Sequence, residues 1–396
     1  MQKLLFKIKK VTLTDIIGII KFLIVLIPAL LKKAYLNLQN KEVWLICETK
    51  TSAHDNGYIF YKYVRINHPE VNCYYAIDYK SEDYQKVKKY NKTIKWGSLY
   101  HYYTYISCSK NISSHKEGNP NHLLFTILHL YFNLFNNRVF LQHGVLYQDY
   151  EMFYQKNTKF KVFITGAKPE YEFVKTKYGY KNNEIKYTGL ARFDNLHDFK
   201  VDNKIILYIP TWRRWLDTKD KFENSNYYKR ISSLINNKEL EEILERNNKY
   251  LYFYLHQSTE KYINLYNKHN KRIRILNSKT ADIQDLLKKG ALLITDYSSI
   301  FTDFVYMKKP IIYYQYDKEE FINKHISNYR KSYFDFEKDG FGKVLNKEED
   351  LLKEINYFIK NNFQIRKTHL KKIQDFFIIY DNKNCERIYN SLMEVK

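Results

Sequence analysis

The chain has 396 residues, of which 44% are hydrophobic, and its 66 Lys and Arg outnumber its 43 Asp and Glu to give a formal net charge of +23. This length exceeds the size at which one core usually stops growing, so two domains are expected, and no Gly-, Ser- or Pro-rich stretch indicates a long flexible linker between them. The charge excludes no anionic partner: nucleic acid, an acidic membrane and a phosphate-rich substrate all fit.

The first predicted element is an apolar helix near the amino terminus. Residues 16–31 read IIGIIKFLIVLIPALL, with a charge at Lys21 and an expected bend or break near Pro28. The run is shorter than the roughly 20 apolar residues of a spanning helix, and no small-residue cleavage site follows it. Flanking lysines are Lys3, Lys7, Lys9, Lys10, Lys32 and Lys33.

We therefore expect residues 1–40 to form an interfacial, membrane-associating segment, with its apolar side in the acyl boundary and its lysines on anionic headgroups. A buried helix of the first domain and a single span are the alternatives. Either membrane interpretation places the body of the protein at the cytoplasmic face of the membrane, as a peripheral protein in the interfacial case. The four widely spaced cysteines also fit a reducing cytoplasm.

After residue 40, short apolar runs alternate with longer amphipathic stretches. The runs are rich in β-branched and aromatic residues and are too short for helices, which predicts βαβ units and parallel sheets. The predicted strands are 43–47, 73–77, 138–142, 161–165, 205–210, 250–255, 291–295 and 310–314.

A polar stretch at 196–204 is the expected domain boundary, because a new strand begins directly after it. We expect one doubly wound α/β domain over 41–198 and a second over 199–396 that includes the carboxyl-terminal helices. Parallel sheets of this kind bind ligands beyond the carboxyl ends of their strands, so chemistry is sought directly after each strand.

Several common sites are absent from the sequence. Neither Gly-x-Gly-x-x-Gly nor Gly-x-x-x-x-Gly-Lys occurs, and no Cys/His cluster has zinc spacing. A site without a metal or cofactor is therefore the simpler expectation.

The first strand-end motif is Gln142-His143-Gly144. A histidine is largely neutral at pH 7, so His143 is a candidate base for an attacking hydroxyl, and Gly144 permits a sharp turn. A lone histidine is more often structural.

The motif Pro210-Thr211-Trp212-Arg213-Arg214 follows the strand at 205–210. Its two arginines suit a diphosphate, because a guanidinium offers paired donors to phosphate oxygens. The alternative is a solvated basic turn.

Two further strand ends carry candidate phosphate contacts. His256 ends the strand at 250–255 and is a candidate donor to phosphate or a surface histidine. The segment from Asp296 to Ser298 and Ser299 leads into a predicted helix, whose first turn would seat a phosphate. Simple helix capping explains one of these residues but not the group. We interpret Asp317, after the strand at 310–314, as a helix cap.

Together these residues resemble the CDP-glycerol glycerophosphotransferases of teichoic acid and capsule synthesis. The resemblance runs from about Val43 to the turn at 340–342. Its elements are Glu48, Asp55-Asn56-Gly57, Gln142-His143-Gly144, Gly189-Leu190-Ala191-Arg192-Phe193-Asp194-Asn195-Leu196, Pro210-Thr211-Trp212-Arg213, Thr295-Asp296-Tyr297-Ser298-Ser299 and Lys309-Pro310-Ile311-Ile312-Tyr313-Tyr314.

The resemblance implies a GT-B fold, with two Rossmann-like domains facing a cleft, and metal-independent transfer of glycerol phosphate from CDP-glycerol to a lipid-linked or polymer acceptor. It implies that His143 is the general base and that His256 contacts the donor diphosphate. Arg213, Ser298 and Ser299 would hold phosphate oxygens, and Asp303 a donor hydroxyl. The chemistry requires His143 to meet the phosphate seat at Ser298 and Ser299.

Two departures keep the donor open. Gln257 stands where the family commonly has proline, and Arg214 where an acidic residue often stands, so CDP-ribitol is an alternative donor. The length resembles that of shorter members that lack an extra acceptor-binding or transferase domain. A nucleotide-sugar glycosyltransferase and a basic membrane- or nucleic-acid-binding protein are competing hypotheses. Against nucleic acid, the lysines are scattered among acidic residues rather than gathered in one tract.

Overall fold

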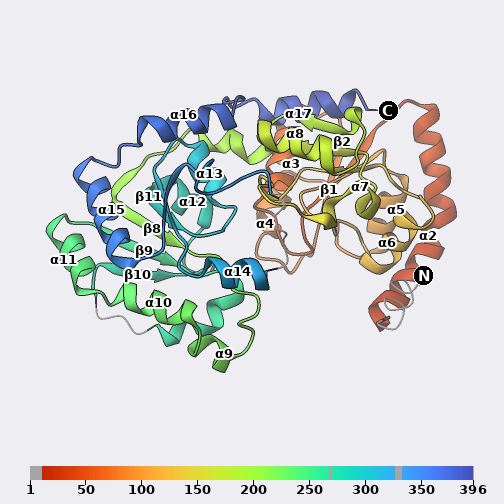
Figure 1. The fold of residues 1–396 in the computed structure, drawn as a ribbon. Coiled ribbons are helices and arrows are strands. Elements are labelled where there is room, and N and C mark those ends of the chain that lie inside the picture. Colours follow the sequence, from red (N-terminus) through yellow and green to blue (C-terminus); the bar gives the residue numbers. More distant parts are fainter. Residues whose placement is uncertain (1–10, 267–269, 326–331, 396) are drawn as a thin grey trace. The chain divides into compact units, whose positions relative to one another are not determined.

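The computed structural model describes residues 11–266, 270–325 and 332–395 and divides into two compact units. Unit 1 contains the chain up to Val145, Glu151–Asp194 and the segment from Asp381 onward. Unit 2 contains Leu146–Tyr150 and Asn195–Tyr380. Each unit is a parallel sheet with helices packed on it (Figure 1).

Unit 1 is built on a seven-stranded sheet in the order β3-β2-β1-β4-β5-β6-β7, and every paired neighbour is parallel. The interior strand β1 is buried along its whole length, as expected of a strand covered on both faces. The strands are β1 Val43–Cys47, β2 Asn72–Ile77, β3 Thr93–Lys95, β4 Lys110–Ser113, β5 Arg138–Phe140, β6 Val162–Thr165 and β7 Ile185–Tyr187.

The helices of unit 1 connect consecutive strands, except for the first helix, which precedes all the strands in the chain, and the last, which follows them. They are α2 Leu13–Leu38, α3 Asn56–Asn67, α4 Tyr84–Lys88, α5 Leu99–Ser107, α6 His122–Leu130, α7 Gln155–Thr158, α8 Lys168–Lys177 and α17 Asn384–Met393, with short 3-10 turns at Glu151–Phe153, Asn182–Glu184 and Ala191–Leu196.

Unit 2 is built on a six-stranded parallel sheet in the order β10-β9-β8-β11-β12-β13. Its strands are β8 Asp202–Ile209, β9 Tyr250–Tyr254, β10 Ile273–Leu276, β11 Gly290–Thr295, β12 Ile311–Tyr314 and β13 Gly342–Leu345. Its helices are α9 Lys219–Glu223, α10 Asn226–Ile235, α11 Lys238–Arg246, the 3-10 helix η4 Gln257–Leu265, α12 Ile283–Lys289, α13 Phe301–Tyr306, α14 Lys318–Lys324, α15 Glu348–Lys360 and α16 Lys367–Phe376.

All eight predicted strands are present, although their ends move by up to three residues. The expected boundary at 198/199 differs from the division at Asp194/Asn195. The final helix, expected in the second domain, belongs to unit 1 because the Asp194 carboxylate accepts hydrogen bonds from the backbone N–H groups of Asn384 and Cys385, both at 2.8 Å.

The amino-terminal helix α2 lies alongside α5 and α6 in unit 1 (Figure 1). Its inner face buries Phe22, whose ring is 6.0 Å from that of Phe125 on α6. Lys21 also turns toward the protein, where its Nζ donates to the carbonyl oxygen of Gly97 at 2.6 Å. The helix continues through Pro28, so the expected break there is wrong. Of its flanking lysines, Lys3, Lys7, Lys9 and Lys10 lie outside the described residues.

Candidate functional site

Each sheet has one switch point, where the strand order reverses, and the candidate residues follow strands that border this point or are one strand away from it. In unit 1 this point lies between β1 and β4, and in unit 2 between β8 and β11. Open parallel sheets bind ligands in the crevice beyond the strands at such points. The sequence-predicted residues that follow β5, β8, β9 and β11 therefore lie at the carboxyl edges of the two sheets.

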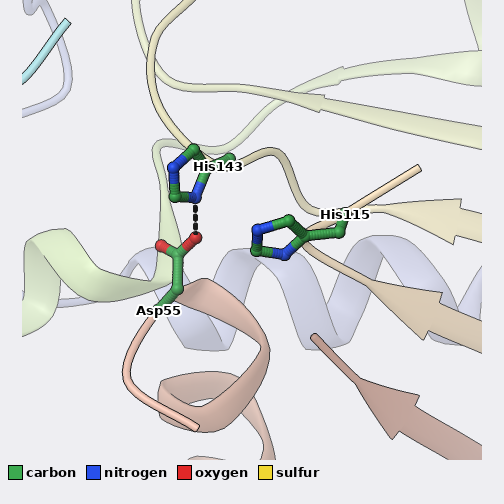
Figure 2. A group of neighbouring side chains, drawn as sticks. All are labelled: Asp55, His115 and His143. Atoms are coloured by element: carbon green, nitrogen blue, oxygen red, sulfur yellow. Dashed lines mark hydrogen bonds and ion pairs between the residues drawn. The ribbon is translucent and has the colours of Figure 1, made fainter. Parts of the chain in front are cut away.

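In unit 1, His143 is held by a buried carboxylate. Its Nδ1 lies 2.5 Å from Oδ2 of Asp55, which stands at the amino end of α3 (Figure 2). The His143 side chain is 68% exposed, whereas that of Asp55 is 4% exposed. One edge of the imidazole is thus fixed on the protein while the side chain as a whole remains accessible.

Arg192 holds the other oxygen of the same carboxylate, because its Nη1 lies 2.6 Å from Asp55 Oδ1. Burial alone would raise the pKa of Asp55, but the charges of His143 and Arg192 outweigh it and lower the pKa below its usual range. In turn the Asp55 carboxylate raises the pKa of His143, against the opposing effect of desolvation. Asp55 therefore remains ionised at neutral pH, beside an imidazole that readily accepts a proton.

A second imidazole, His115, follows β4 and lies beside His143, with ring centroids 4.8 Å apart (Figure 2). Burial and the neighbouring His143 lower the pKa of His115 to about 4, so it is neutral at pH 7. Asp55, His115 and His143 each offer a ligand atom within 4.8 Å of the others, a donor set suited to a divalent metal. Arg192 already supplies the positive charge at Asp55, so the residues fit an internally neutralised pair better than a metal centre.

Buried polar groups fix the loops that carry this cluster. Glu48 Oε1 accepts from the backbone N–H groups of Asp55 and Tyr58, at 2.9 and 2.8 Å. Asn56 donates to the carbonyl oxygen of Gln142 at 2.8 Å and accepts from the N–H of Arg192 at 2.9 Å. Gln142 adopts a left-handed backbone conformation with φ of 65°. These bonds tie the loops of three separate sequence motifs together.

In unit 2, Arg213 is fully buried and joins three loops. Its Nε and Nη2 donate to the two carboxylate oxygens of Asp317 at 2.7 and 2.9 Å, and Nη2 also lies 2.9 Å from Asp296 Oδ2. Asp317 occupies the N-cap position of α14, as predicted, but its side chain makes no cap bond to the helix and binds Arg213 instead. The predicted contact of Arg213 with phosphate is not favoured, because carboxylates occupy Nε and Nη2 and the carbonyl oxygen of Thr211 accepts from Nη1.

The loops around Arg213 present other polar groups. Thr211 is also tied inward, since its N–H and hydroxyl both donate to Asp296 Oδ1, at 2.8 and 2.6 Å. Ser299 and Arg214, in contrast, are exposed. Ser298 is half-buried beside Ser299, just before α13. Ser298, Ser299 and Arg214 are therefore better placed than Arg213 to meet a ligand's phosphate oxygens.

His256 follows β9 and stacks on Trp212, with ring centroids 5.5 Å apart and planes inclined by 15°. Its Nδ1 accepts a hydrogen bond from the backbone N–H of Ser258 at 3.1 Å. Desolvation lowers the pKa of His256, so its neutral form predominates at pH 7.

Besides Arg213 and Asp296, two further predicted site residues are buried. Gly144 is buried directly after His143. Asp303 is 1% exposed on α13, where its carboxylate accepts from the side chain of Gln284 at 3.3 Å. This burial favours a structural role for Asp303 over direct contact with a donor hydroxyl.

Sequence reasoning gave no role to Asp55, Arg192 or His115. Asp55 and Arg192 appeared only as parts of the family resemblance, and His115 follows a strand, β4, whose polar residues gave no strand signal. A carboxylate within reach of a strand-end histidine would have been the signal, but Asp55 and His143 are 88 positions apart in the chain.

Two parallel-sheet α/β units, each with ionisable side chains beyond its switch point, define a GT-B-like protein. A solved structure of the wall teichoic acid polymerase TagF shares this fold with a TM-score of 0.67, over 97% of this chain and 98% of that chain, at 18% identity. The chain belongs to the CDP-glycerol:poly(glycerophosphate) glycerophosphotransferase family, whose family model matches residues 30–394.

Two curated relatives contain this region within longer proteins. The chain is 34% identical over 373 residues to the minor teichoic acid biosynthesis protein GgaB of Bacillus subtilis strain 168, covering 90% of this chain and 40% of GgaB. It is 31% identical over 198 residues to the teichoic acid poly(glycerol phosphate) polymerase of Bacillus spizizenii, covering 50% of this chain and 45% of the polymerase. The chain thus spans less than half the length of either relative.

Proposed function

We propose that this chain transfers glycerol phosphate from CDP-glycerol to a hydroxyl of a lipid-linked or polymer acceptor in teichoic acid or capsule synthesis, with release of CMP. The observation that carries the proposal is His143, an accessible imidazole fixed on the buried carboxylate of Asp55 in a member of this family. Such an arrangement suits general-base catalysis, which needs an oriented imidazole with a pKa near the working pH.

In the proposed reaction, the acceptor hydroxyl attacks the phosphorus that carries glycerol. A new phosphorus–oxygen bond forms, the bond between this phosphorus and the CMP phosphate oxygen breaks, and CMP leaves with that oxygen. The acceptor proton passes to His143, and the Asp55 carboxylate stabilises the resulting imidazolium.

On the donor side, Ser298, Ser299 and Arg214 are the proposed contacts of the diphosphate, and His256 adds a further donor. An exposed guanidinium and hydroxyls supply the hydrogen bonds that the departing phosphate gains as charge moves onto it. Arg213 supports these loops from below rather than touching the donor. The reaction is proposed to need no metal or other cofactor.

A donor screen tests the proposal. The purified protein is incubated with an acceptor lipid and CDP-glycerol, CDP-ribitol or a UDP-sugar, and nucleotide release and product mass are measured. CMP release with glycerol phosphate addition is expected. Ribitol phosphate addition would identify the alternative donor, and UDP release alone would reject the proposal in favour of a glycosyltransferase.

We also propose that α2 lies in the plane of an anionic membrane at its cytoplasmic face. The helix is long and apolar enough to cross a membrane, but its inner face packs on α5 and α6, which belong to the sheet domain. Its outer face is apolar and open, with Leu23 61%, Ile27 70% and Leu31 67% exposed. Exposed apolar stretches of this size mark interaction surfaces, and the preceding segment and Lys32 and Lys33 supply basic charge.

Vesicle co-sedimentation with a Leu23→Ser/Ile27→Ser/Leu31→Ser variant tests this membrane contact. Only the outer face changes, so the packed face and the fold are preserved, which a deletion of the helix would not achieve. Binding to anionic vesicles should fall at least tenfold, because each buried aliphatic side chain contributes about 1.5 to 3 kcal/mol. The control Ile66→Ser, an exposed apolar residue on α3, should bind normally, and undiminished binding of the triple variant would refute the proposal.

A further inference from the structure

We infer that the structure holds His143 and His256 in opposite neutral tautomers, His143 with an unprotonated Nε2 and His256 with a protonated Nε2. The two partners that set this difference are the carboxylate of Asp55 and the backbone N–H of Ser258. The inference rests on the proposed transfer reaction, because it explains why one histidine acts as a base and the other as a hydrogen-bond donor.

The partner at Nδ1 of His143, the Asp55 carboxylate, is a hydrogen-bond acceptor. Asp55 is ionised, since Arg192 donates to its Oδ1 at 2.6 Å, and an ionised carboxylate can only accept hydrogen bonds. The proton of the neutral imidazole must therefore stand on Nδ1, 2.5 Å from Asp55 Oδ2. This leaves the lone pair on Nε2, which is the atom available to take a proton from a hydroxyl.

The partner at Nδ1 of His256, the backbone N–H of Ser258, is a hydrogen-bond donor. The N–H of Ser258 points its hydrogen at Nδ1 over 3.1 Å, at the start of η4. A backbone N–H can only donate, so Nδ1 must carry the lone pair and the proton of the neutral imidazole stands on Nε2. Stacking on Trp212 fixes the plane of the ring. His256 therefore offers an N–H donor, which suits a phosphate oxygen and cannot serve as a base.

Asp55 is accordingly a positioning residue that acts through His143. Asp55→Asn provides a sharp test, because Arg192 offers only donors and will keep the amide oxygen on its own side. The amide NH₂ then faces His143 and donates to Nδ1, which moves the imidazole proton to Nε2. The variant should lose about 10³- to 10⁴-fold in kcat, as expected for a base locked in the wrong tautomer, with little change in the KM for CDP-glycerol.

The pH profile separates this role from a structural one. His143 faces Asp55, His115, Arg192 and Glu48, and the Asp55 charge is the main cause of its raised pKa. In Asp55→Asn, the acid limb of the kcat/KM profile should therefore move to lower pH. Glu70→Gln is the matched control: Glu70 pairs with His68 at 3.3 Å in the same unit, and its loss should leave both rate and profile unchanged.

The tautomers themselves are measured by ¹⁵N NMR of histidine-labelled protein at alkaline pH, with signals assigned from His143→Ala and His256→Ala. His143 should show a protonated Nδ1 and His256 a protonated Nε2. Ser258→Pro, which removes the N–H, should loosen the His256 preference and raise the KM for CDP-glycerol roughly tenfold. Ser258→Ala keeps the N–H and should match wild type.

The outcomes are distinguishable. The same tautomer for both histidines in the wild-type spectrum would overturn the inference, even if Ser258→Pro failed to fold. Full activity of His143→Ala would overturn the proposed base role and leave the tautomer result standing. If His143→Ala retains only a residual rate, Asp55→Asn should not lower that rate further, and a full-rate Asp55→Asn single variant would refute the positioning role.

Discussion

Replacing Arg213 by Met should destabilise unit 2 rather than merely weaken donor binding. The guanidinium has three close carboxylate contacts, two to Asp317 at 2.7 and 2.9 Å and one to Asp296 at 2.9 Å, with all three side chains at most 1% exposed. Methionine preserves much of the side-chain volume but leaves two carboxylates buried without a counter-ion. Removing one partner of a buried ion pair costs about 3 to 5 kcal/mol.

Arg214→Met is the control, because the adjacent arginine is exposed. Urea unfolding, followed by hydrogen exchange of peptides from β8 and β11 in unit 2, gives the change in unfolding free energy. Arg213→Met should lower it by about 3 to 5 kcal/mol, whereas Arg214→Met should change it by less than about 0.5 kcal/mol. CDP-glycerol binding should fall in Arg214→Met without loss of stability.

Adding Asp317→Asn to Arg213→Met should restore part of the stability, because the amide removes one unpaired buried charge. If Arg213→Met had wild-type stability and weakened donor binding, this reasoning would be refuted, and Arg213 would be a phosphate contact as predicted from the sequence.

Three further predictions concern single positions. Burial, with the nearby Asp55, raises the pKa of Glu48 from 4.5 to about 7, so the native state holds a proton that the unfolded state releases. The unfolding free energy of wild type relative to Glu48→Gln should therefore fall by up to about 3 kcal/mol as the pH rises from 4.5 to 7. A pH-independent difference in urea unfolding would contradict this. Ser299→Ala should raise the KM for CDP-glycerol about 3- to 10-fold with unchanged thermal stability, because its exposed hydroxyl contributes a hydrogen bond only when donor is bound; a lowered Tm would indicate a structural role instead. In Gly57→Ala the new Cβ would lie 2.8 Å from Cγ of Glu48 and 3.0 Å from the carbonyl oxygen of Cys47. Calorimetry should therefore show an unfolding free energy lower by about 1 to 3 kcal/mol, and an unshifted unfolding transition would show that the loop adjusts to the methyl group.

The strands predicted from sequence were those with continuous apolar runs, and this follows from how each strand is buried. β1 and β11 are covered on both faces and consist of apolar or small residues. β4 occupies an equally central place in its sheet but contains Lys110, Asn111 and Ser113. Its burial depends on partners elsewhere in the chain, such as Glu42, 2.5 Å from Lys110 Nζ, and no local pattern contains them.

The final helix illustrates the same limit at the level of domains. Its apolar spacing predicted a helix correctly, but nothing in residues 381–396 shows which core it covers. The helix is held on unit 1 by Asp194, almost 200 positions earlier, whose carboxylate accepts hydrogen bonds from the backbone of Asn384 and Cys385. Asp194 stands inside a motif that the sequence comparison had marked without a function, and its role is to fasten the chain end to unit 1.

Arg213 and Arg214 show why motif positions alone do not separate ligand contacts from structural ties. Both follow β8, both are arginines, and both suit a diphosphate by chemistry. What divides them is the presence of Asp317, about a hundred positions away, which occupies the Nε edge of one guanidinium and leaves the other exposed. The same reasoning separates the two candidate-site histidines, since an acceptor at Nδ1 of His143 and a donor at Nδ1 of His256 give chemically identical side chains opposite hydrogen-bonding properties at Nε2. The role of each such residue is therefore set by the partner at its inner edge, which the fold alone supplies.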